Sequence, residues 1–130
     1  MLLDTHVLLW WRAGGTRLSR TAASLLDEAP RLLVSPITFW KVGMLTGEGR
    51  VALDRPTATW TRDVVAHERV AVAELAASTA VAAAELPDFH GDPADRLLYA
   101  TAGALRLPLV TKDGQMHEYA SDHGGVAVRW

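Results

Sequence analysis

Short runs of apolar residues alternate along the chain with longer segments in which apolar residues recur every three or four positions. The short runs predict buried strands, and the longer segments predict helices with one buried face. The expected strands are 1–4, 31–35, 70–72, 108–111 and 126–128, and the expected helices are 5–11, 19–28, 36–46, 57–68, 78–85, 92–106 and 114–120. This alternation favours a parallel sheet covered by helices, which is an α/β fold.

The helix expected to start at Pro36 is strongly apolar. Ile37, Trp40, Met44 and Leu45 have the spacing of one buried stripe on such a helix. Lys41 comes directly after Trp40, which predicts a position at the rim of this stripe.

The composition limits the class of protein. With 130 residues, the chain has the size of a single domain, expected to span 1–130, and a formal charge of −2 argues against binding nucleic acid through bulk charge. The absence of cysteine excludes disulfides and thiolate metal sites. Asp4 and His6 interrupt the first apolar run, so neither a signal peptide nor a membrane span is expected, and the cytoplasm is the expected compartment.

Two expected strands run directly into an aspartate that precedes a helix. Asp4 follows the first strand, and Asp113 follows the strand at 108–111. Each aspartate can cap the following helix. Because ligand sites in open parallel sheets lie beyond the carboxyl ends of the strands, the pair also predicts a site at one edge of the sheet.

A third acidic element opens the helix expected at 92–106. Asp92 is placed to cap this helix ahead of Pro93, and Asp95 falls in its first turn, where it can also point toward a metal. Clustered carboxylates repel one another unless a cation lies among them. Hard oxygen ligands favour Mg²⁺ or Mn²⁺ over Zn²⁺, and such ions cleave phosphodiesters by activating water. The scattered histidines, including His6 and His90, are expected to be structural.

Four segments, in their order and spacing, resemble one family. They are LLDTHVLLW, SPITFWKVGML, HGDPADRLLYATA and LVTKDGQMHEY, and together they cover most of the chain. The sequence is similar to the PIN-domain ribonucleases of the VapC toxin family. The resemblance implies a three-layer α/β/α fold with a mainly parallel sheet, Mg²⁺-dependent endoribonuclease activity, a VapB-type antitoxin partner and, in many members, a homodimer.

The resemblance also implies roles for individual residues. The metal-binding acids would be Asp4, Asp95 and Asp113, with Asp92 close by. Thr5 and Thr111 lie beside the acids in the sequence and would hold water or phosphate, and Arg96 would contact the RNA backbone or pair with Asp92 or Asp95.

One position departs from the family pattern. In SPITFWKVGML the family places a glutamate of the acidic cluster where this chain has Lys41. The swap changes the local charge by two units, and an ammonium near three carboxylates would compete with Mg²⁺ for the same negative field. The departure predicts that Lys41 impairs activity in this chain.

Two other classes remain open from the sequence. A non-catalytic module would keep the fold and bind only RNA or the antitoxin, its site being broken by Lys41. A phosphotransfer domain, either a receiver or a haloacid-type phosphatase, would also have an aspartate after the first strand. The phosphatase needs a second aspartate at the position where this chain has His6. The receiver needs an aspartate after the strand at 70–72, and none follows that strand here. Both observations argue against the phosphotransfer class.

The tryptophans predict a partner surface. Trp10, Trp11 and Trp40 lie on the two helices beside the proposed site, and together they suggest an apolar groove. By the resemblance, this groove would receive the C-terminal segment of the antitoxin.

Overall fold

Five strands form one sheet in the computed structural model, which describes residues 1–130. They are β1 (Leu2–Leu3), β2 (Leu32–Val34), β3 (Val70–Val72), β4 (Leu109–Val110) and β5 (Val128–Arg129). Their spatial order is β3-β2-β1-β4-β5, and every neighbouring pair is parallel. The predicted α/β fold with a parallel sheet is therefore confirmed.

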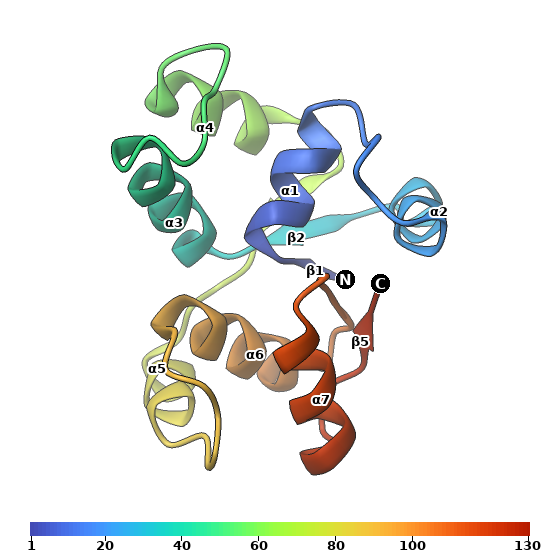
Figure 1. The fold of residues 1–130 in the computed structure, drawn as a ribbon, viewed down its shortest axis with the longest axis vertical. Coiled ribbons are helices and arrows are strands. Elements are labelled where there is room, and N and C mark those ends of the chain that lie inside the picture. The colour runs from blue at the N-terminus through green and yellow to red at the C-terminus, as the bar shows by residue number, and fades with distance from the viewer.

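Seven helices connect and cover the strands. They are α1 (Thr5–Arg12), α2 (Arg20–Glu28), α3 (Pro36–Gly47), α4 (Thr57–Ala66), α5 (Ala77–Ala84), α6 (Pro93–Leu105) and α7 (Gly114–His123). Figure 1 shows α1 to α4 on one side of the sheet and α5 to α7 on the other, which gives three layers. None of these helices is long and apolar enough to cross a membrane.

Both faces of the sheet are buried, and alternate residues of one strand serve different faces. Leu3 and Val110 belong to the core beneath α1 to α4, whereas Leu2 and Leu109 belong to the core beneath α6 and α7. Because successive side chains of a strand point to opposite faces, a strand covered on both sides must be apolar throughout. This is why the strands appear in the sequence as short, continuous apolar runs.

The order of the strands also determines where a ligand can lie. From β1 the chain moves outward to β2 and β3, and the later strands β4 and β5 lie on the other side of β1. The direction of winding thus reverses between β1 and β4. In open parallel sheets a crevice forms at this point, beyond the carboxyl ends of the strands. Asp4 and Asp113, which follow β1 and β4, are both directed to this crevice.

The predicted apolar stripe of α3 is wrong at Trp40 and Met44, whereas Leu45 is buried and Ile37 packs against the core, as predicted. The buried residues of this helix are Thr38, Val42 and Leu45, while Trp40 and Met44 are 53% and 43% exposed. Most side chains of α3 are apolar, so its sequence allows more than one buried stripe. Packing against the neighbouring helices buries the stripe of Thr38, Val42 and Leu45 and leaves Trp40 exposed to solvent.

Candidate active site

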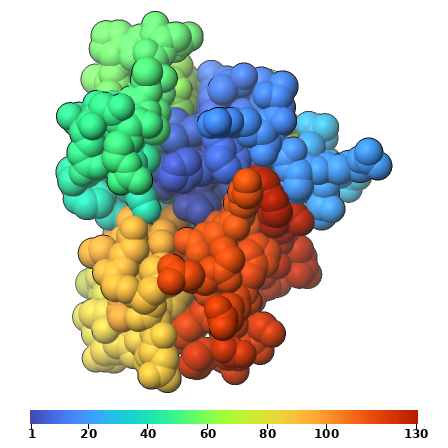
Figure 2. Space-filling model, viewed as in Figure 1, coloured from blue at the N-terminus to red at the C-terminus, as the bar shows by residue number.

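An open pocket of about 490 Å³ lies beyond the carboxyl ends of β1 and β4. It is strongly polar, and only one of its ten lining residues is hydrophobic. The lining residues are Asp4, His6, Trp10, Lys41, His90, Asp92, Asp95, Lys112, Asp113 and Gln115. In Figure 2 the blue surface of α1, the green surface of α3 and the orange surface around α6 and α7 meet near the middle of the face. The structure thus brings Asp4, Asp95 and Asp113 together from three separate parts of the chain.

Asp4 and Asp113 each cap a helix and also line the pocket. One oxygen of Asp4 accepts a hydrogen bond from the backbone N–H of Thr5 (2.6 Å), and one oxygen of Asp113 accepts from those of Gln115 (2.8 Å) and Met116 (3.3 Å). Such caps use only one of the two carboxylate oxygens. The capping role and the site role, which were alternatives from the sequence, are compatible in the structure.

Thr111 links Asp4 to Asp113 through hydrogen bonds on the buried side of the pocket. Its hydroxyl is fully buried, donates to Oδ2 of Asp4 (2.6 Å) and accepts from the backbone N–H of Asp113 (3.0 Å). Asp4 itself is only 7% exposed. A buried carboxylate needs such donors, because an unpaired charge away from water is costly. Thr111 therefore holds Asp4 and the start of α7 in fixed relative positions.

The first turn of α6 brings two more carboxylates to the pocket. Oδ1 of Asp92 accepts from the backbone N–H groups of Ala94 (2.9 Å) and Asp95 (3.2 Å), so Asp92 is the expected cap. Asp95 is buried, and its Oδ2 lies 2.8 Å from Nε2 of His90. The imidazole thus orients the carboxylate that the cap has placed at the pocket.

Lys41 reaches this acidic cluster from α3. Its Nζ lies 3.1 Å from Oδ2 of Asp92 and 3.6 Å from Oδ1 of Asp95, and its side chain is only 19% exposed. Burial alone would lower the pKa of the Lys41 ammonium, but the charges of Asp95, Asp92 and Asp4 outweigh burial and raise this pKa. Lys41 is therefore a charged partner of the cluster at neutral pH.

Asp92 and Asp95 respond to this environment in opposite ways. Burial raises the pKa of Asp95, and the hydrogen bond from His90 and the charge of Lys41 offset it only in part. Burial would also raise the pKa of Asp92, but the hydrogen bond from Lys41 and the backbone donors of the cap lower it. Folding thus favours the ionised form of Asp92 and disfavours the ionised form of Asp95.

The donor atoms around Asp95 suit a divalent metal. His90, Asp95 and Asp113 each offer one ligand atom, and these atoms lie within 4.8 Å of one another. Carboxylate oxygens with a single imidazole nitrogen form a donor set that Mn²⁺ and Mg²⁺ accept. The ammonium of Lys41 lies on one side of this set and neutralises part of the charge that would attract the ion.

Comparison with known proteins identifies the family. The family described as PIN domain matches residues 1–122. The chain is 40% identical to Ribonuclease VapC22 of Mycobacterium tuberculosis over 121 residues, which cover 92% of this chain and 91% of the relative. The chain is a PIN domain of the VapC family. The resemblance found in the four sequence segments is thereby confirmed, and neither a receiver nor a haloacid-type phosphatase is the family that matches.

Solved structures of the family share the fold. VapBC2 from Rickettsia felis, bound to a DNA fragment from its promoter, aligns with a TM-score of 0.67 at 12% identity and covers 98% of this chain and 96% of the other. VapBC-1 from nontypeable Haemophilus influenzae aligns with a TM-score of 0.68 at 14% identity and covers 98% and 95%. These likenesses confirm the three-layer α/β/α fold of this PIN domain.

The structure does not place Arg96 in the pocket, contrary to expectation. Its guanidinium donates to the backbone carbonyls of His90 (3.1 Å), Phe89 (2.9 Å) and Ala83 (3.2 Å), and it forms no ion pair with Asp92 or Asp95. The side chain turns back toward the end of α5 and the loop before α6. Arg96 therefore holds the loop that carries His90.

The two threonines also differ from the prediction. Neither Thr5 nor Thr111 lines the pocket, and both are fully buried. The hydroxyl of Thr5 has no hydrogen-bond partner, while Thr111 acts through Asp4 and Asp113. Direct contact of either hydroxyl with phosphate does not fit this geometry.

His90 is the site residue that sequence reasoning missed. It was expected to be structural, yet it contacts Asp95 and offers a metal ligand atom. The available signal was its position two residues before the capping Asp92, which brings any side chain there close to the first turn of α6. His6 lines the pocket too, but it is exposed and packs against Trp10.

The three tryptophans do not form the predicted groove. Trp11 packs against His67, and Trp40 projects from α3 into solvent. Trp10 instead lines a groove that includes Trp60. Because Trp10 and Trp11 are neighbours on one helix, they face different directions.

The opposite pKa shifts of Asp92 and Asp95 give a testable pH dependence. Folding raises the pKa of Asp95, so the folded state favours the protonated carboxyl. The contribution of Asp95 to the free energy of unfolding is therefore favourable near pH 4 and is lost as the pH rises through the folded pKa. Asp95→Asn is therefore expected to raise the free energy of unfolding at pH 7 by roughly 1 kcal/mol. This gain should disappear as the pH falls toward about 4.

Asp92→Asn is the matched control, because asparagine caps a helix as well as aspartate does. The pKa of Asp92 is lowered by folding, so its contribution is present at neutral pH and lost as the pH falls. This variant is expected to be less stable than the unaltered chain at pH 7. Urea unfolding between pH 4 and pH 7 measures both differences, and an equal sign for the two variants at pH 7 would contradict the account.

Proposed function

We propose that this PIN domain is built to cut RNA phosphodiesters as a metal-dependent endoribonuclease, the toxin of a type II toxin–antitoxin system. The observation that carries the proposal is the convergence of Asp4, Asp95 and Asp113, with His90 and Asp92, in one open pocket. The similarity to a ribonuclease supports RNA as the substrate. If cellular RNA is the substrate, the protein would act in the cytoplasm.

The proposed cofactor is Mg²⁺ or Mn²⁺, held by Asp4, Asp95 and Asp113 with Asp92 close by. A bound divalent ion supplies an activated water and balances charge on the leaving oxygen. His90 adds a nitrogen donor to the carboxylates, which favours Mn²⁺ over Mg²⁺. Lys112, exposed at the rim of the pocket, is positioned to attract phosphate.

A second function, a non-catalytic module that binds RNA or an antitoxin, is favoured by Lys41. Its ammonium pairs with Asp92 and Asp95 and so takes up charge that would otherwise hold the metal. We propose that the chain with Lys41 is impaired as a nuclease although it keeps the other residues of the site.

We also propose a VapB-type antitoxin as a partner, together with a homodimer. The support for the antitoxin is that two of the solved structures with this fold are VapBC proteins and another is described as a toxin–antitoxin complex from Klebsiella pneumoniae. The exposed pair Trp40 and Met44, one turn apart on α3, offers apolar surface that a partner would cover.

Cleavage of RNA by the Lys41→Glu chain tests the proposed function. In Mg²⁺ or Mn²⁺ this variant is expected to cut RNA at least about a hundredfold faster than the unaltered chain, since it regains a carboxylate and loses a competing cation. EDTA should abolish the cleavage, and adding Asp95→Asn to the variant should abolish it as well. A Lys41→Glu chain that folds but cuts no RNA would leave the non-catalytic module as the function.

A further inference from the structure

His117 lies on α7 outside the acidic pocket, yet it contacts the segment that carries Asp113. Its Nε2 lies 2.8 Å from the carbonyl oxygen of Thr111, and its backbone N–H donates to the carbonyl of Asp113 (3.2 Å). Because a carbonyl oxygen only accepts hydrogen bonds, Nε2 must carry a proton, whether the ring is neutral or charged. The side chain is half-buried and pairs with no carboxylate, so the imidazole serves as a donor to this segment.

The polar groups of Thr111 attach the segment 111–113 to different parts of the molecule. Its backbone N–H donates to the carbonyl of Arg129 in β5 (3.0 Å), and its hydroxyl joins Asp4 to the N–H of Asp113. No backbone N–H reaches its carbonyl, so the imidazole of His117 is the donor that holds this group. Because the peptide bond is planar, a fixed carbonyl also fixes the direction in which the chain continues.

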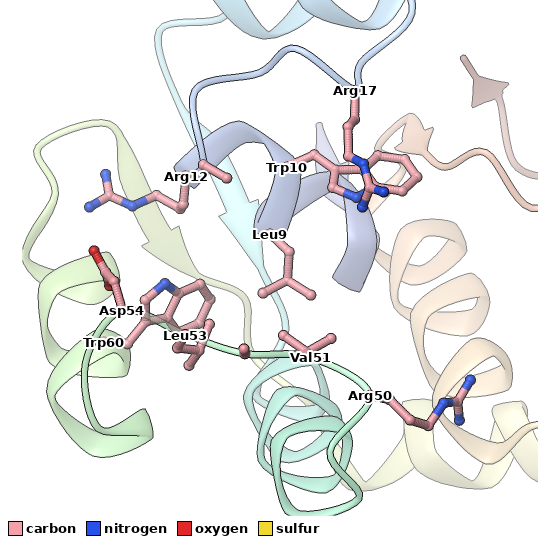
Figure 3. Close-up of a pocket in the computed structure, with 11 residues that line it drawn as sticks. Leu9, Trp10, Arg12, Arg17, Arg50, Val51, Leu53, Asp54 and Trp60 are labelled. Carbon is pink, nitrogen blue, oxygen red and sulfur yellow. The ribbon is translucent and has the colours of Figure 1, made fainter.

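The peptide held in this way leads directly to two residues of the acidic pocket, Lys112 and Asp113. Nζ of Lys112 lies 5.8 Å from the centre of the ring of Trp10, which Figure 3 shows on α1 beside Arg17. Asp113 offers one of the three ligand atoms that lie within 4.8 Å of one another. Rotation of the peptide between Thr111 and Lys112 would therefore displace both a cation and an acid of the pocket.

We propose that His117 is a positioning residue, whose ring holds the peptide between Thr111 and Lys112 and thereby keeps the carboxylate of Asp113 in place for a shared divalent ion. The role in metal binding rests on the proposed function, whereas the holding of the segment does not. Residues behind the ligands of a metal affect its affinity because they fix the direction from which each ligand approaches. His117 acts through the backbone on which Asp113 is carried, rather than through the carboxylate itself.

Amide hydrogen exchange in His117→Met and His117→Gln tests the holding of the segment without metal. Methionine and glutamine have similar length and helix propensity, but only glutamine can donate to the carbonyl of Thr111. In His117→Met the N–H of Asp113 is expected to exchange about tenfold faster than in the unaltered chain, because its bond to the hydroxyl of Thr111 opens when the peptide can rotate. In His117→Gln its exchange should stay within about threefold of the unaltered chain.

The N–H of Thr111 is the internal control, since it donates across the sheet to Arg129 and belongs to the preceding peptide. Its exchange should be unchanged in His117→Met, whereas a general loss of stability would accelerate the amides of Thr111 and Asp113 alike. His123→Met is the matched control variant, because His123 is also on α7 but stacks on Tyr119 and lies outside the acidic pocket. It should leave the exchange of the Asp113 N–H as it is in the unaltered chain.

Titration calorimetry with Mn²⁺ measures the link to the metal site in the Lys41→Glu chain. Adding His117→Met is expected to raise the Kd for Mn²⁺ about tenfold, whereas adding His117→Gln should keep it within about threefold. A residue that contributed only to stability would not change this Kd in a chain that is still folded.

Three results would overturn the proposal. They are equal exchange of the Asp113 N–H in His117→Met and in the unaltered chain, equal acceleration of the Thr111 and Asp113 amides, and faster exchange at Asp113 with an unchanged Kd for Mn²⁺. If the Lys41→Glu chain binds no Mn²⁺, the proposed function fails, and hydrogen exchange still decides whether His117 holds the segment.

Discussion

The Lys41→Glu chain is expected to lose about 2–3 kcal/mol of folding free energy in EDTA and to regain most of it on addition of Mn²⁺. In the unaltered chain Lys41 is 3.1 Å from Asp92 and 3.6 Å from Asp95, and both Lys41 and Asp95 are largely shielded from water. The replacement removes this pairing and adds a carboxylate to an acidic pocket. Without a cation, the repulsion destabilises the folded state.

Metal should reverse the loss because only the folded chain brings the ligands together. An ion that binds the folded state alone contributes about 2.7 kcal/mol when its free concentration is a hundred times its Kd. The unaltered chain, in which Lys41 neutralises the cluster, should show little dependence of stability on Mn²⁺. Thermal unfolding in EDTA and in graded Mn²⁺ measures the effect directly, and calorimetry gives the affinity.

Lys112→Glu is the matched control for this prediction. It makes the same change of charge in a residue that lines the same pocket, but Lys112 is exposed and has no carboxylate within 4.0 Å. Its loss of stability in EDTA should be below about 1 kcal/mol. If Lys41→Glu unfolds at the same temperature with and without Mn²⁺, the metal site is not the one described.

Thr111→Val is expected to lower the free energy of unfolding by about 2 kcal/mol. Valine fills nearly the same space as threonine, so packing is kept and only the hydroxyl is lost. Asp4 then loses the buried donor at 2.6 Å, and the N–H of Asp113 loses its acceptor at 3.0 Å. Hydrogen bonds to charged groups are worth more than neutral ones, and a buried partner left alone bears the full cost of desolvation.

Thr111→Ser separates the hydroxyl from the methyl group. Serine keeps the donor and the acceptor, so it should retain most of the stability that valine loses. In the Lys41→Glu background, valine but not serine should also weaken Mn²⁺ binding, because Asp4 and Asp113 are then no longer held in register. Equal stability of the serine and valine variants in urea unfolding would show that the bridge contributes nothing.

Much of this protein could be predicted from sequence because its signals are local. The strands are short continuous apolar runs, and the helix starts at Ser19, Pro36 and Asp92 carry residues that favour the first turn. Strand-end acids in a parallel sheet converge by topology alone. Asp4 and Asp113 could therefore be placed at one edge before any contact was known.

The side chains that were predicted wrongly from the sequence are those whose direction depends on packing between distant elements. On α3 several stripes are apolar enough to be buried, and only contact with neighbouring helices turned Trp40 outward. Arg96 follows Asp95 directly, yet its guanidinium turned to the carbonyls of the preceding loop rather than to the pocket. Long side chains find donors and acceptors that sequence spacing does not reveal.

The sequence by itself determined the α/β class, the acids at the strand ends and the unusual charge at Lys41. Tertiary structure alone decided the partners of those charges. It brought Lys41 to Asp92 across 51 positions of the chain and Thr111 to Asp4 across 107. The physical reason is that periodicity and capping act within a few residues, whereas ion pairs and buried hydrogen bonds depend on which surfaces meet when the layers pack.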